Sequence, residues 1–161
     1  MGAHDLSAML WRERELLELL VFKLEEEQLL LTAGKSRWLQ HATREVEQVL
    51  ERVRDAGLAR TVEVAALAAE WGSAENATLR DVVEKAPAGP WGEIFTGHLR
   101  ALTELATQIK DLRDTNEQFL RSAARSTQET MANLAPEAGT YDAHGVAGLS
   151  PAAARLFDTT L

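Results

Sequence analysis

The chain of 161 residues contains no cysteine, which excludes a disulfide framework, an iron–sulfur cluster and a thiol nucleophile. Proline is scarce, and all four prolines lie at position 87 or later, so the first half contains none of these strong helix breakers. No run of about 18 consecutive apolar residues occurs, so we expect no membrane-spanning helix. The N-terminus, MGAHDL, has neither the basic start nor the apolar core of a secretory signal, and we expect a cytoplasmic protein.

Positive charge is also in short supply. Seventeen Lys and Arg residues face 25 Asp and Glu residues, which gives a net charge of −8 and disfavours nucleic acid and anionic membrane as partners. No local basic patch escapes this average, because the arginines at 52, 54 and 60 alternate with acidic residues. With 45% hydrophobic residues, the chain has enough apolar material to fold around a core.

Helix-forming residues are abundant, and three long segments carry apolar residues at helical spacing of three and four. Residues 6–32 contain the stripe Leu6, Leu10, Leu17, Leu20, Leu24 and Leu31. Residues 37–71 contain Leu39, Ala42, Val46, Val49 and Val53, and the small residues that follow Asp55 predict close approach of a neighbouring helix. Residues 91–134 contain Phe95, Leu99, Leu102, Ala106, Ile109, Leu112, Asn116, Phe119, Ala123, Thr127, Met131 and Leu134.

The segments between and after these helices contain turn-forming residues. Within the connector 72–90, Thr78 can cap a short helix that ends by Ala86. Residues 135–161 contain Pro136 and several glycines, and Ser150-Pro151 can start a short terminal helix. We therefore predict an all-α fold, an elongated antiparallel bundle of three long helices (residues 1–134) with a short connector helix and a flexible C-terminal tail (135–161).

No pattern of catalytic or metal-binding residues is present. None of the four histidines follows a glutamate by three residues, which argues against a di-iron site, and we predict no metal and no cofactor. The run Glu25-Glu26-Glu27 cannot converge on one substrate, because successive helical residues point about 100° apart, and we interpret it as a solvated helix face. We therefore predict that the protein is not an enzyme.

Two residues allow more than one interpretation. Asn116 falls on the apolar stripe of the third segment, where a polar side chain can fix helix register or meet a polar group of a partner. The alternative is that the helix is partly exposed at this position. Tyr141 is the only tyrosine, and in a Gly- and Pro-rich tail it can either serve as a docking anchor or fold back onto the bundle.

The sequence resembles the FlgN family of flagellar type III export chaperones, particularly its actinobacterial-type members. The resemblance is carried by residues 10–17, continuing into 22–28, by residues 34–45, by 116–120 (Asn-Glu-Gln-Phe-Leu), and by 140–145 (Thr-Tyr-Asp-Ala-His-Gly). It covers most of the chain, from about Leu6 to Gly145.

The resemblance implies that the protein binds C-terminal helical segments of flagellar hook-associated proteins, the hook–filament junction proteins, and delivers them to the export gate at the membrane. The cargo-binding residues of the family carry over to Leu112, Asn116, Phe119, Leu120, Ala123, Thr127 and Met131. Docking to the export gate carries over to Tyr141, with Asp142 and Gly145 beside it. The alternative is a structural coiled-coil protein that self-associates through the third helix, and a homodimer of the cargo-free chaperone is also open.

Overall fold

The computed structural model describes the backbone of residues 2–142 and the side chains of residues 2–135. This part of the chain contains no strand; α1 spans Ala3–Thr32, α2 Ser36–Glu70, α3 Leu79–Glu84 and α4 Trp91–Asp142. The predicted all-α class, with three long helices and a short connector helix, is confirmed. Within residues 2–142, no helix combines the length and apolar character needed to cross a membrane. The chain divides into two compact units, Met1–Leu120 and Arg121–Leu161, and α4 contributes to both.

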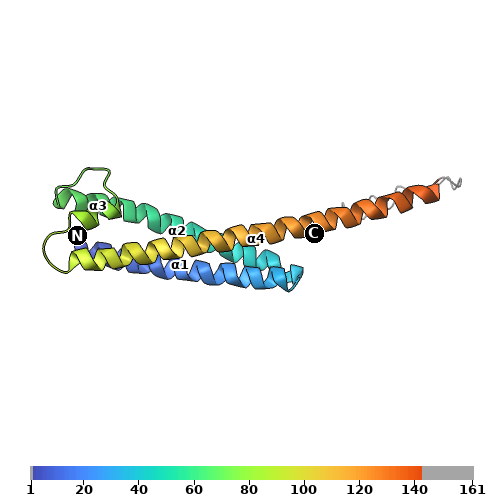
Figure 1. The fold of residues 1–161 in the computed structure, drawn as a ribbon, viewed down its shortest axis with the longest axis horizontal. Coiled ribbons are helices and arrows are strands. Elements are labelled where there is room, and N and C mark those ends of the chain that lie inside the picture. The colour runs from blue at the N-terminus through green and yellow to red at the C-terminus, as the bar shows by residue number, and fades with distance from the viewer. Residues whose placement is uncertain (1, 143–161) are drawn as a thin grey trace, which may run out of the picture. The chain divides into compact units, whose positions relative to one another are not determined.

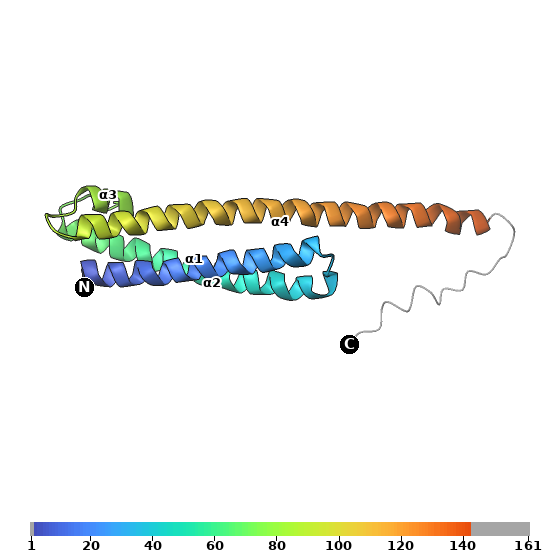
Figure 2. The ribbon, with the colours of Figure 1, turned by 60° about the horizontal axis from the view of Figure 1, so that its bottom comes forward.

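In the first unit, α1 and α2 form an antiparallel hairpin, and the N-terminal part of α4 runs alongside it (Figures 1 and 2). The turn between α1 and α2 includes Gly34 at φ 65°, a left-handed conformation that glycine adopts without a Cβ clash. Beyond the turn, Lys23 Nζ lies 2.7 Å from Glu45 Oε2 and ties the two helices together at the surface. Such an exposed ion pair contributes little stability, so the hairpin depends on its apolar face.

The core of the first unit is built from the apolar stripes that the sequence predicts. Buried side chains come from all four helices: Leu6, Leu10, Leu17, Leu20 and Leu24 of α1, Val46, Val49, Val64, Leu67 and Ala68 of α2, Leu79 and Val82 of α3, and Phe95, Leu102 and Ile109 of α4. Each fully buried leucine or phenylalanine contributes roughly 1.5–3 kcal/mol relative to an exposed one. This burial holds the N-terminal part of α4 against the hairpin.

The short helix α3 forms for the reason that the sequence indicates. Thr78 is its N-cap, and the Thr78 backbone N–H donates to Asp81 Oδ2 at 2.7 Å while the Asp81 N–H donates to Thr78 Oγ1. These two bonds satisfy backbone donors that a helix start would otherwise leave without a partner. The bond from the Thr78 backbone N–H, and secondarily one from the Thr78 hydroxyl to Asp81 Oδ2 at 2.8 Å, lower the pKa of the Asp81 carboxyl. The cap therefore fixes the start of α3, and the buried side chains of Leu79 and Val82 hold this helix against the bundle.

Helix α4 is longer than predicted. It ends at Asp142, eight residues beyond Leu134. The sequence prediction gave too much weight to Pro136 and Gly139 as breakers. One proline removes a single backbone hydrogen bond and kinks a helix, but it does not always end one.

The expected close approach of a helix to the small residues of α2 is also wrong in part. Val64, Leu67 and Ala68 pack into the core, but a Cβ added to Gly57 would meet no atom within 4 Å. Beside this stretch, Leu58 and Val62 are about 70% exposed. Small residues permit a close helix contact but do not enforce one, and here α2 and α4 are separated by an open groove.

Candidate functional site

Helix α4 changes from covered to exposed at Asn116. Phe95, Leu102, Ile109 and Asn116 are spaced seven residues apart, and all four are buried. After Asn116, every residue through Ala135 is exposed. The last buried position of α4 is therefore the polar one, among the residues whose side chains the structure describes.

Asn116 joins α4 to the hairpin through a buried polar network. Its side chain is 2% exposed, and Nδ2 donates to the Leu24 carbonyl oxygen at 2.9 Å and to Glu27 Oε1 at 3.1 Å. The other carboxylate oxygen of Glu27 accepts from Thr43 Oγ1 at 2.9 Å. Asn116, Glu27 and Thr43 therefore tie α4, α1 and α2 together, and of the two interpretations of Asn116 the structure supports fixation of helix register.

Glu27 corrects the interpretation of the run Glu25-Glu26-Glu27 as a solvated face. Glu25 is exposed, but Glu27 is only 5% exposed because it follows Leu20 and Leu24 on the buried side of α1. Two hydrogen bonds compensate its carboxylate for the loss of water. Its position three residues after Leu24 indicates the buried side of α1 and could have been recognised in the sequence. Its partner Asn116 lies 89 residues away and could not be identified from the sequence.

The predicted cargo-binding residues lie in three environments that differ in solvent exposure. Leu112 is half-buried against the core, and Asn116 is buried. Phe119 and Leu120, the last residues of the first unit, are 39% and 37% exposed. In the second unit, Ala123, Thr127 and Met131 are exposed, Met131 by 68%. The apolar side chains beyond Asn116 are thus accessible, whereas Asn116 itself is occupied by α1.

The predicted docking residues lie at the edge of the described chain. Tyr141 and Asp142 are the last two residues of α4, beyond the residues whose side chains are described. Gly145 lies outside the described residues. Their role remains a prediction.

The groove between α2 and α4, which the sequence did not indicate, consists of two adjoining hollows. The first, the basic hollow, has a volume of about 790 Å³ and is lined by Arg60, Thr61 and Val64 of α2, by residues 76–80, and by Leu99, Leu102, Thr103, Ala106, Thr107 and Lys110 of α4. The second, the apolar hollow, has a volume of about 530 Å³ and lies over Leu17, Leu20 and Leu24 of α1, between α2 and the stretch of α4 from Ala106 to Leu120. Ala106 and Lys110 line both hollows.

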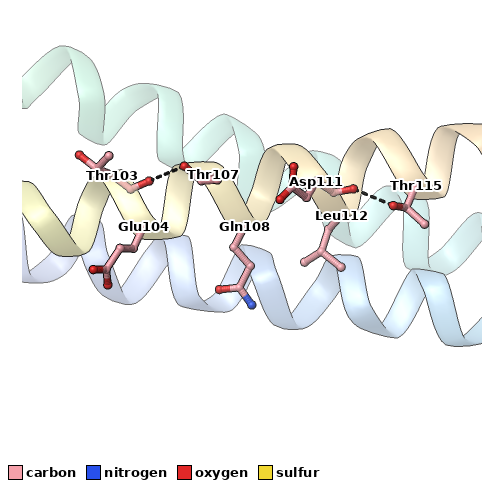
Figure 3. Close-up of a pocket in the computed structure, with 7 residues that line it drawn as sticks. All are labelled: Thr103, Glu104, Thr107, Gln108, Asp111, Leu112 and Thr115. Carbon is pink, nitrogen blue, oxygen red and sulfur yellow. Dashed lines mark hydrogen bonds between the residues drawn. The ribbon is translucent and has the colours of Figure 1, made fainter.

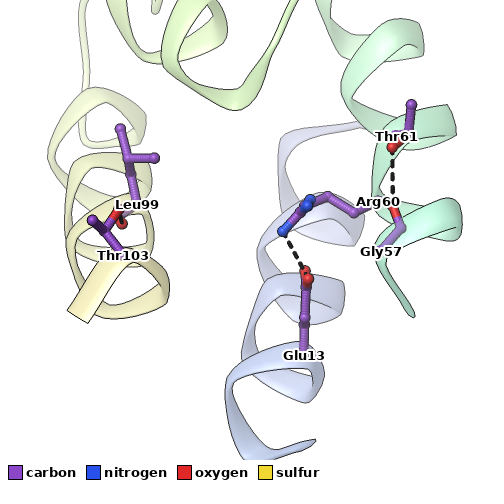
Figure 4. Close-up of polar contacts among 6 residues, drawn as sticks. All are labelled: Glu13, Gly57, Arg60, Thr61, Leu99 and Thr103. Atoms are coloured by element: carbon purple, nitrogen blue, oxygen red, sulfur yellow. Dashed lines mark hydrogen bonds and ion pairs between the residues drawn. The ribbon is translucent and has the colours of Figure 1, made fainter. Parts of the chain in front are cut away.

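A charged pair lies beside the basic hollow. Arg60 Nη1 donates to Glu13 Oε1 at 2.7 Å, and the side chain turns toward α1 rather than toward Leu99 and Thr103 on α4 (Figure 4). Burial raises the pKa of the Glu13 carboxyl, and Arg60 only partly offsets this effect. Arg60 is thus held by Glu13, and neither side chain fills the space toward α4.

A shallow hollow of about 530 Å³ is lined by α4 residues alone, and it shares Thr103 and Thr107 with the basic hollow (Figure 3). Thr107 Oγ1 donates to the Thr103 carbonyl oxygen at 3.0 Å, and Thr115 Oγ1 donates to the Asp111 carbonyl oxygen at 2.9 Å. Because these hydroxyl groups are bonded to their own helix, the hollow presents no converging donors for a ligand. Such bonds slightly destabilise and bend helices.

A buried serine–histidine contact was not expected from the sequence. His98 is 2% exposed, its Nε2 lies 3.2 Å from Ser7 Oγ, and Trp11 packs edge-on at 5.2 Å between ring centroids. Burial, and secondarily the positive charge of Arg14, lower the pKa of His98. His98 Nδ1 has no hydrogen-bond partner in the described structure, whereas a catalytic histidine needs an orienting group there. We therefore interpret the contact as packing between α1 and α4.

No metal centre is evident in the described part of the chain, since no three His, Asp or Glu side chains there converge. In a comparison with known protein families, a model described as FlgN protein matches residues 1–148. No curated protein and no solved structure matches the chain.

Proposed function

The chain belongs to the FlgN family of flagellar export chaperones, and we propose that it binds C-terminal helical segments of hook-associated proteins through the exposed stripe of α4. Members of this family are chaperones rather than enzymes. In this proposal the protein acts in the cytoplasm, keeps its cargo soluble and competent for export, and delivers it to the type III export gate. The stripe consists of Leu112, Phe119, Leu120, Ala123, Thr127 and Met131, with Asn116 at its covered end.

The exposure of α4 beyond Asn116 is the observation that carries this proposal. Phe119, Leu120, Met131 and Leu134 are large apolar side chains, each between 37% and 68% exposed. Together with Ala123 and Thr127, the residues Phe119, Met131 and Leu134 recur at intervals of four and three, the spacing by which one helix recognises another. An amphipathic cargo helix would cover these side chains and shield its own apolar face from aggregation.

The same stripe also supports the alternative of self-association, because a second copy of α4 would cover it equally well. Co-expression with a hook–filament junction protein, followed by mass measurement of the purified species, distinguishes the two. A chaperone is expected to copurify with this cargo and to lose any homodimer when cargo binds. A dimer that persists and takes up no junction protein would instead support a structural coiled coil.

For export-gate docking we propose Tyr141, with Asp142 and Gly145. Because these residues lie ten or more positions beyond Met131, we expect Tyr141→Ala to reduce secretion of the junction protein severalfold while its affinity for the chaperone stays unchanged. Tyr141→Phe serves as the control that retains the ring. Normal secretion by the alanine variant would remove Tyr141 from the docking site, and a parallel loss of cargo affinity would place it in the cargo site instead.

A further inference from the structure

We propose that the α2–α4 groove is a second part of the cargo site and that it receives an acidic amphipathic helical segment. This inference rests on the proposed chaperone function and extends the site from the stripe of α4 into the first unit. The lining of the groove from Leu99 to Leu120 covers 21 helical steps, or about 32 Å at 1.5 Å per residue. An open groove of that length between two helices suits a third helix better than a compact ligand.

The floor of the groove is apolar, and charged residues line its edges. In the apolar hollow, Leu17, Leu20 and Leu24 form the floor, and Val46 and Ile109 are among the residues of the walls. The same hollow is also lined by charged residues of both signs, Glu27, Glu47, Lys110, Arg113, Asp114 and Glu117. Because four of these six are acidic, the acidic end of an occupant belongs at the basic hollow. The stretch of α4 opposite α2 carries Thr103, Ala106 and Thr107, side chains too short to fill the space. The apolar face of an additional helix would therefore fill the space between α2 and α4.

The charge of the basic hollow selects the chemistry of the occupant. Its charged lining residues are Arg60, Arg80 and Lys110, and none is acidic, although the whole chain carries a net charge of −8. Glu13 compensates Arg60 at 2.7 Å. Arg80 and Lys110 are exposed and form no ion pair within the described structure. A segment with acidic residues at one end of its apolar face would complement these two cations.

Other occupants fit this surface less well. Residues 150–161 of this chain contain one arginine and one aspartate, so they offer no excess of negative charge to the hollow. A second copy of the chain would have to bring an acidic, apolar helix face of its own. Because Leu120 belongs both to the stripe of α4 and to the apolar hollow, the groove continues the proposed cargo surface, and we assign it to a segment of the cargo rather than to a second copy.

The test uses the full chain and two synthetic 21-residue peptides with leucines at helical spacing. One peptide carries three glutamates near one end, and the matched peptide carries glutamines there. We expect the glutamate peptide to bind at least about tenfold more tightly, and raised salt to remove most of the difference. The double variant Arg80→Glu, Lys110→Glu should lose this preference, and a lysine peptide should bind that variant better than the wild-type chain. Equal affinity of the first two peptides for the wild-type chain would overturn the proposal.

Arg100→Glu is the matched control, because Arg100 is exposed on α4 and does not line the groove. This variant should still bind the glutamate peptide more tightly than the glutamine peptide. If it does not, the preference is a general effect of charge on α4, and the groove proposal is overturned. A concentration-dependent increase in mass that Lys110→Glu abolishes would assign the groove to a second copy and would also overturn it.

The groove and the chaperone function can fail separately. If a junction protein binds and Phe119→Glu weakens it while Arg80→Glu, Lys110→Glu does not, the groove proposal is wrong and the proposed function stands. If no junction protein binds but the glutamate peptide shows the expected preference, the groove is an acidic-helix receptor in a protein whose cargo was misassigned.

Discussion

Replacing Phe119, Leu120 and Met131 together with glutamate is expected to weaken binding of a hook-associated protein by at least about 100-fold. Each side chain is exposed, between 37% and 68%, so the substitutions should cost the fold little. In the complex, each would place a carboxylate in an apolar interface, and truncation of even one central apolar anchor can cost about 2 kcal/mol. Affinity measured by calorimetry, beside helix content by circular dichroism, checks the prediction.

The control adds negative charge to α4 without touching the stripe. Gln118 and Arg125 are exposed and lie at least about 100° around the helix from Phe119, Leu120 and Met131, given 100° per residue. The variant Gln118→Glu, Arg125→Glu, which changes the net charge by as much as the triple variant does, should therefore bind cargo almost normally. Because Leu120 also lines the α2–α4 groove, Met131→Glu alone separates the stripe from the groove. Full affinity in the triple variant would contradict a cargo site on α4.

Asn116 is left out of this variant because of what the structure adds to the sequence. Its place on the stripe could be predicted from its spacing, since Leu102 and Ile109 precede it by multiples of seven. Its surroundings could not, because they depend on the Glu27 carboxylate of α1, which lies 89 residues away in the sequence. A charge at Asn116 would disturb the fold before it tested cargo binding. The buried stripes of the core were predictable, because burial of one helix face spaces apolar residues by three and four, and this spacing is visible within each segment on its own.

The groove and the end of α4 lay beyond prediction for a related reason. Whether Gly57 and Thr61 of α2 meet Thr103 of α4 depends on how the two helices diverge, and short side chains are compatible with contact or with an opening. Likewise, Pro136 marks a weak point in a helix without determining whether the helix continues. Both features depend on how one segment of the chain packs against another. The periodicity of a single segment does not determine that packing.

Asn116→Asp is expected to destabilise the first unit by about 3–5 kcal/mol at neutral pH, a loss of roughly 10–20 °C in Tm. The change removes both donors, to the Leu24 carbonyl and to Glu27, and places a second carboxylate where the amide now lies 3.1 Å from the first. Two buried carboxylates this close cannot both ionise without a large cost. Protonation of the pair in the folded state relieves the repulsion, so the variant should gain stability relative to the wild type as pH falls and lose it as pH rises.

Thermal unfolding of both proteins between about pH 4 and pH 8 measures this difference. Gln118→Asp, an exposed carboxylate two residues along α4, should unfold like the wild type at every pH. Adding Glu27→Gln to the Asn116→Asp variant makes residue 27 the donor and residue 116 the acceptor. The double variant should recover part of the lost stability, because the glutamine amide can donate to the new carboxylate. The Leu24 carbonyl stays without its donor, so recovery is incomplete. A Tm for Asn116→Asp that equals the wild type at pH 7 would mean that α4 does not rest on α1 at this position, and that its exposed stripe begins closer to Ile109.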